Sequence, residues 1–102
     1  MIKERVDRAR DIQRQRFAGS RKIYCNSQMG SREIEQHCRL DDAGHLLLEK
    51  GVRKLGLSAR AYHRILKIAR TIADMEGSAE ISSANVAEAI QYRRFDRKPQ
   101  AG

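Results

Sequence analysis

Arg60 is the residue whose type and position most clearly indicate chemistry. Ser58 is predicted to cap a helix, which would place Arg60 at the second helical position, beside backbone N–H groups that no helical carbonyl accepts. A cation there faces the positive end of the helix dipole and costs of the order of 0.3–1 kcal/mol. Free amides and a guanidinium fork together suit a phosphate supplied from elsewhere, although an arginine that simply extends into solvent fits the pattern equally well.

Two further cations follow Arg60 on the same helical face, Arg64 at i+4 and Lys67 at i+7. They form either a basic strip for phosphate or DNA contacts beside Arg60, or an ordinary solvated face. Arg70 and Asp74, spaced i and i+4, are predicted to form a surface ion pair that contributes a few tenths of a kcal/mol.

No nucleotide-hydrolysing motif is found. A phosphate loop has the pattern G-x-x-x-x-G-K-[ST], and the nearest stretch, residues 19–22, lacks the first glycine and the length of the loop. We therefore expect that this chain contains no catalytic residues and is not an enzyme by itself.

The cysteines and histidines do not predict a metal site. Cys25, His37, Cys38 and His45 show neither C-x2-C nor H-x3-H spacing. With only two cysteines and no other sign of secretion, free thiols are expected in preference to a disulfide.

The formal charge of +8 is concentrated at the two ends of the chain. Residues 1–22 carry eight Lys/Arg and three acids, residues 93–98 carry four and one, and residues 23–92 carry nine of each. Basic ends attract polyanions, so Arg14 and Arg16 are candidate contacts to phosphate or DNA. A solvated or domain-facing charged helix explains the same pattern.

The composition predicts an all-α fold, a compact bundle of four to five helices in one domain. One proline, five aromatics and many Ala, Leu, Arg and Glu residues favour helices over a sheet. We expect a domain over residues 1–94 with a loop at 18–30, and a flexible tail at 95–102. With neither a membrane span nor a signal peptide recognisable, a soluble cytoplasmic location is expected.

Apolar spacing and capping residues indicate where the helices lie. The clearest helix begins after Ser58 and ends near Glu76 before Gly77. Its apolar stripe consists of Tyr62, Ile65, Leu66, Ala69, Ile72 and Ala73. The other helices are predicted over residues 2–17, from a Ser31 cap to about 38, from an Asp41 or Asp42 cap to about 55, and from a Ser82 or Ser83 cap to about 94.

The stretch GLSARAYHRILKIARTIADMEG at residues 56–77, the segment ISSANVAEAIQYR at 81–93 and the opening RVDRARDIQRQRF at 5–17 carry a family resemblance. Together they closely resemble the end of magnesium-chelatase-related AAA+ ATPases of the ComM type. The match covers nearly the whole chain up to Arg93.

The resemblance implies a helical lid that packs on a separate AAA+ core domain of the same protein. It implies that Arg60 is the sensor-2 arginine, which reaches the γ-phosphate of ATP, with Mg²⁺ held by the core. It further implies a homo-hexameric ring and, in relatives, DNA branch migration. The lack of an apolar span in the sequence gives no reason to expect a membrane partner.

Two alternatives to this lid remain open. The core with its phosphate loop is absent from these residues, so the chain is expected to be part of a longer protein. A free-standing basic helical domain that binds nucleic acid, or a protein-docking domain, would also fit the composition.

Overall fold

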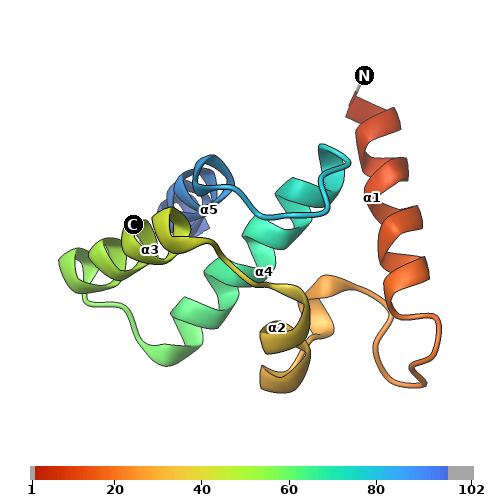
Figure 1. Cartoon of the computed structure of the whole chain (residues 1–102), viewed down its shortest axis with the longest axis horizontal. Helices are drawn as coiled ribbons and strands as arrows, with labels where there is room; N and C mark the ends of the chain where they lie inside the picture. Colours follow the sequence, from red (N-terminus) through yellow and green to blue (C-terminus); the bar gives the residue numbers. More distant parts are fainter. Residues whose placement is uncertain (1, 97–102) are drawn as a thin grey trace.

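The longest helix, α4 (Ala59–Met75), runs through the middle of the molecule and packs against every other described helix except the third α-helix, which packs on the last one (Figure 1). The computed structural model describes residues 2–96, with side chains from residue 3 to residue 92. The other elements are α1 (Ile2–Arg16), the short 3₁₀ helix η1 (Asn26–Gln28), α2 (Ser31–His37), α3 (Asp42–Leu55) and α5 (Ser83–Asp96). The expected all-α bundle is confirmed.

The ends of α4 are set by its own sequence. Ser58 Oγ accepts a hydrogen bond from the Ala61 N–H at 3.2 Å, which confirms the predicted cap. Beyond the C-terminal end, Gly77 adopts φ 73°, a left-handed conformation that glycine enters without steric cost. The predicted start and end of this helix are therefore confirmed.

Local signals also place the other helix termini, with one correction. Asp41 caps α3 through a 2.7 Å bond from the Gly44 N–H, and Gly56 ends α3 at φ 62°. Ser82 Oγ accepts from the Asn85 N–H at 3.1 Å, which confirms a cap before α5. The predicted Ser31 cap is wrong: Ser31 is the first helical residue, and the Glu33 carboxylate accepts from the Gly30 N–H at 3.0 Å instead.

Three predicted boundaries differ slightly. The helix that begins at Ser31 ends at His37, and the first helix ends at Arg16. The last helix continues to Asp96, two residues past its predicted end. The predicted tail beyond Asp96 lies outside the described residues.

The predicted apolar stripe of α4 forms the centre of the core. Ile65, Ala69 and Ala73 are fully buried, and Leu66 and Ile72 nearly so, whereas Tyr62 is half-buried. They share one core cluster with Leu48 of α3 and with Val86 and Ala89 of α5, and α5 packs on both α3 and α4. Full burial of a Leu, Ile or Val side chain stabilises the fold by about 1.5–3 kcal/mol.

α1 stands at the edge of the bundle and packs on α4 (Figure 1). Its buried apolar contribution is small: Ala9 within the helix and Phe17 just after it. Gln13, a polar residue, is also buried. Polar contacts must therefore contribute much of the attachment of α1 to the bundle.

One pair of backbone segments outside the helices is bonded as in a β-sheet. Leu40, between α2 and α3, forms an isolated parallel bridge with Ile81, between α4 and α5. Across residues 2–96, no helix is both long and apolar enough to cross a membrane.

Candidate functional site

Arg60 lies on the exposed first turn of α4, at the second helical position. The first turn contains no acidic residue, and Ser58 satisfies the Ala61 N–H. Within the described chain no hydrogen bond uses the backbone N–H of Ala59 or Arg60. The guanidinium and two amides at the positive end of the helix dipole form a surface suited to an anion.

The two cations that follow Arg60 on α4 differ in exposure. Arg64 is exposed on α4, one turn after Arg60. Lys67 is half-buried, and its Nζ donates to the Ser27 carbonyl oxygen at 3.1 Å. Lys67 therefore fastens the loop around η1 to α4.

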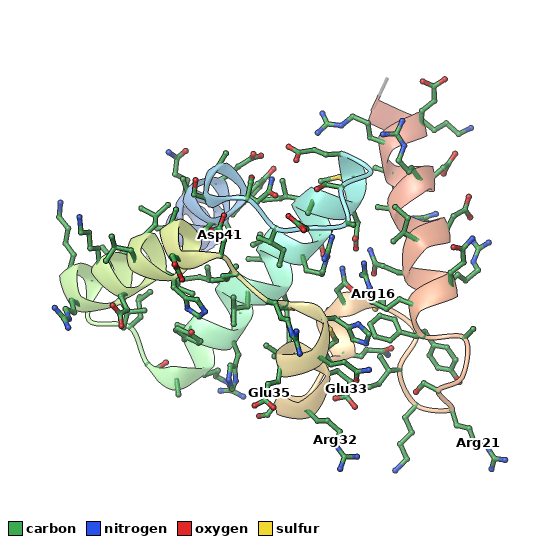
Figure 2. The ribbon with its side chains drawn as sticks, viewed as in Figure 1. Arg16, Arg21, Arg32, Glu33, Glu35 and Asp41 are labelled. Carbon is green, nitrogen blue, oxygen red and sulfur yellow. The ribbon has the colours of Figure 1, made fainter. Side chains whose placement is uncertain are left out.

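The two candidate arginines of α1 have different surroundings. Arg14 is exposed and meets Asp11 at 3.3 Å, with side chains 76% and 65% exposed. Arg16 turns inward toward the rest of the molecule, whereas Arg21 and Arg32 point outward (Figure 2). The Arg16 side chain is 12% exposed and bound to other residues, so it is not a freely exposed cation like Arg14.

Asp74, on the last turn of α4, is the centre of a buried polar group that we call the Asp74 cluster: Asp74, Arg16, Arg70 and Asn26. The carboxylate is fully buried. Arg16 donates to both of its oxygens, at 2.7 and 2.8 Å, and the Asn26 amide donates at 2.9 Å. Arg70 Nε donates at 3.2 Å. Four donors therefore saturate one carboxylate and join α1, η1 and α4.

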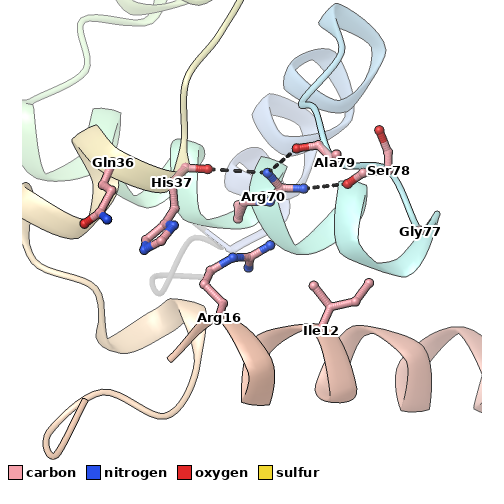
Figure 3. Close-up of a pocket in the computed structure, with 8 residues that line it drawn as sticks. All are labelled: Ile12, Arg16, Gln36, His37, Arg70, Gly77, Ser78 and Ala79. Atoms are coloured by element: carbon pink, nitrogen blue, oxygen red, sulfur yellow. Dashed lines mark hydrogen bonds between the residues drawn. The ribbon is translucent and has the colours of Figure 1, made fainter. Parts of the chain in front are cut away.

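Arg70 also bonds to the backbone of the connection between α4 and α5. Its Nη1 and Nη2 atoms donate to the carbonyl oxygens of Ala79 at 3.1 Å and Ser78 at 2.7 Å, and Nη1 reaches the His37 carbonyl at 3.4 Å (Figure 3). Burial lowers the pKa of Arg70, and the charge of Asp74 opposes that shift. The prediction of a surface Arg70–Asp74 pair is wrong, because both residues are buried.

A signal for this burial is present in the sequence. Leu66, Arg70 and Asp74 are spaced i, i+4 and i+8, so they share one row of the helix, and Leu66 belongs to the apolar stripe. A charged pair that continues an apolar row is a candidate buried pair. The partners Arg16 and Asn26, by contrast, have no local signal in the sequence.

A solvent-open cavity of about 470 Å³ adjoins the Asp74 cluster, between α1, the end of α2 and the connection from α4 to α5 (Figure 3). Arg16 and Arg70 line it from two sides. Its other lining residues are Ile12, Gln36, His37, Gly77, Ser78 and Ala79. The cavity is thus separate from the exposed surface at Arg60.

His37 gives this region a dependence on pH. Burial lowers the pKa of His37 below 6.5, and the charges of Arg16 and Arg70 lower it further, whereas Glu33 raises it. The unfolded chain therefore binds this proton at a higher pH than the folded chain does. The stability that results is fully present above pH 6.5 and is lost as the pH falls toward the folded pKa.

We expect His37→Gln to weaken the decrease in the free energy of unfolding between pH 7.5 and pH 5, measured by urea denaturation at each pH. His45→Gln is the control, because His45 is exposed on α3. An acid-induced loss of stability that is identical in the wild type and His37→Gln would contradict this assignment.

The two cysteines are free, as expected, and differ in environment. Burial raises the pKa of the Cys38 thiol to about 11, whereas Cys25 is half-buried on the loop before η1. Only the thiolate is nucleophilic, so Cys38 is poorly reactive at neutral pH.

At pH 8 a thiol reagent such as dithionitrobenzoate should modify the folded chain in two phases, fast for Cys25 and slow for Cys38. Cys25→Ser should remove the fast phase and leave the slow one. If both thiols of the folded protein reacted in a single fast phase, Cys38 would not be protected.

Among residues 2–96, no group of three or more His, Cys, Asp or Glu side chains is placed to hold a metal ion. Cys38 is buried in the core cluster and His45 is exposed on a different helix.

The described residues form a small all-α domain around the capped helix α4, and comparison with known families identifies which class of domain this is. The model of the family described as magnesium chelatase, subunit ChlI C-terminal, matches residues 1–93. The chain belongs to this family.

Individual relatives make the assignment more specific. The chain is 48% identical over 96 residues to the competence protein ComM of Haemophilus influenzae. It is 42% and 41% identical, over the same length, to uncharacterized proteins named YifB of Escherichia coli and Salmonella typhimurium. Each match covers 94% of this chain and 18% of the relative, so the chain spans about a fifth of the length of these curated relatives. No solved structure matches the chain.

Proposed function

We propose that this domain is the lid of an AAA+ ATPase and that Arg60 is its sensor-2 residue, which contacts the γ-phosphate of ATP bound to a core domain of the same protein. The observation that carries the proposal is the position of Arg60. It is an exposed guanidinium on the first turn of a capped helix, where it costs folding energy and meets unused backbone amides.

Charge-assisted bonds from a guanidinium to phosphate are short and strong, and the dipole of α4 adds to them. A phosphate held there would offset the unfavourable contact between Arg60 and the helix dipole. The presence of ATP would thereby favour one position of the lid over others. The core would hold Mg²⁺ and supply the hydrolytic chemistry.

The role in DNA processing belongs to the whole protein in this proposal. The family resemblance implies a DNA-remodelling ATPase assembled as a ring of six copies, and similarity to a protein named for competence agrees with a role in DNA processing. The lid would couple the state of the nucleotide to movement of such an assembly. A free-standing nucleic-acid-binding domain has less support, because Arg16 already uses three of its five N–H donors within the chain and Arg14 is paired with Asp11.

The test joins this chain to the nucleotide-binding core and replaces Arg60 by alanine. We expect ATP turnover to fall by on the order of 10²-fold, the size of effect seen when one preorganised electrostatic donor is removed. Nucleotide-dependent assembly, followed by size-exclusion chromatography, should weaken in parallel. Unchanged turnover together with unchanged assembly would rule out the sensor role.

A further inference from the structure

The cavity beside the Asp74 cluster is a second place where this domain concentrates positive charge. It lies near the opposite end of α4 from Arg60. Arg60 and Arg70 are ten residues apart, which corresponds to about 15 Å of helix. A ligand in this cavity would therefore not be the phosphate proposed to contact Arg60.

The charges of the cluster do not balance. Two guanidiniums, on side chains 12% and 5% exposed, share one carboxylate that is fully buried. No acidic residue is among the described residues that line the cavity. Because a buried charge is costly unless it is paired, the excess positive charge favours an anion at this place.

The hydrogen-bonding capacity of the two arginines is also not exhausted. A guanidinium has five N–H donors. Three of those of Arg16 and four of those of Arg70 reach acceptors within the described chain. Both side chains line the cavity, which leaves donors on each of them for a ligand.

The remaining lining is compatible with an oxyanion. The Gln36 amide can donate, as can one ring nitrogen of neutral His37. The backbone carbonyl oxygens of His37, Ser78 and Ala79 all accept from Arg70, so their negative charge is already compensated. Figure 3 shows Arg16, rising from α1, opposite Arg70 and flanked by the His37 ring.

We propose that this cavity binds a phosphate oxyanion between Arg16 and Arg70, with Gln36 and His37 at its α2 side. The unused Nε and Nη2 donors of Arg16 can form a fork that matches phosphate geometry, and the one unused Nη2 donor of Arg70 can add a bond from a different helix. A free phosphate and a phosphate of a nucleic-acid backbone present the same chemistry. Occupancy would join α1, α2 and α4 through the ligand.

The experiment titrates the 102-residue chain with inorganic phosphate in a low-salt buffer that contains no other oxyanion. Binding is followed by ¹H–¹⁵N correlation spectra, including the arginine Nε–H signals. We expect saturable binding at one site, with the largest shifts at Arg16, Arg70 and His37. Shifts that grow without saturation, or that are spread over all surface cations, would overturn the proposal.

Gln36→Glu tests the site without threatening the fold, because Gln36 is exposed at the cavity. A carboxylate there repels the ligand, and we expect phosphate affinity to fall by at least about tenfold. Gln15→Glu is the matched control: it makes the same charge change at an exposed position of α1 that does not line the cavity. Equal losses in both variants would show general electrostatic attraction and no built site.

Two further arms complete the test. Arg60→Ala should leave phosphate binding in the cavity unchanged, so this proposal and the sensor proposal can fail independently. A loss of binding in that variant as large as in Gln36→Glu would overturn the second site. A short single-stranded oligonucleotide then distinguishes the sources of phosphate: shifts at the same residues assign a nucleic-acid backbone, whereas a response to inorganic phosphate alone assigns a free phosphate.

Discussion

Replacing Asp74 by alanine should lower the free energy of unfolding by about 3–5 kcal/mol, because removal of one partner from a buried ion pair leaves the other charge uncompensated. In this chain it leaves two guanidiniums without their carboxylate. Asn26 also loses the acceptor of one of its amide bonds. The free energy of unfolding of a whole domain is usually about 5–15 kcal/mol, so this loss would remove a large part of the total stability.

Urea denaturation monitored by circular dichroism gives the measurement. Asp11→Ala is the matched control, since Asp11 also pairs with an arginine of its own helix but is 65% exposed. Exposed ion pairs contribute about 0–1 kcal/mol, so Asp11→Ala should change the free energy of unfolding by no more than this. If the two variants lost similar stability, the Asp74 cluster would not hold the domain together.

Replacing Arg60 by alanine should have opposite effects on stability and on activity. The isolated chain should gain up to about 1 kcal/mol, because a cation leaves the positive end of the α4 dipole and alanine is the best helix former. ATP turnover of the chain joined to its core should fall by on the order of 10²-fold. A residue that serves only the fold cannot produce this combination.

Arg53→Ala provides the control for the second prediction. Arg53 is exposed in the last turn of α3, where its charge suits the helix dipole. Its loss should slightly destabilise the chain and leave ATP turnover unchanged. An equal fall in turnover for both variants would assign the effect to charge alone and contradict a specific role for Arg60.

The helices were predictable because their signals are local. The stripe from Tyr62 to Ala73 and the caps at Ser58, Asp41 and Ser82 each depend on residues a few positions apart, and the structure confirms them. Gly30 was missed as the cap of α2, because the stabilising group there is the Glu33 side chain and glycine itself offers none. The family assignment, likewise, follows from motifs visible in the sequence.

The Asp74 cluster was not predictable in the same way, because its bonds join distant segments. Arg16 and Asp74 are 58 residues apart, and Asn26 and Asp74 are 48 apart. Before the chain folds, Arg16 resembles any other cation of the basic first segment. Only the packing of α1 on α4 distinguishes it from Arg14, which stays exposed.

Because the middle of α4 is buried in the core, the Asp74 cluster and Arg60 keep their separation when the domain moves as a whole. Asp74 anchors one end of the helix to α1, and Arg60 lies near the other end, fourteen residues or about 21 Å away. A rotation of the whole domain by about 10° around the cluster would displace Arg60 by roughly 4 Å, more than the length of a hydrogen bond. A small rotation of the domain about one end of α4 is therefore enough to make or break a contact at the other.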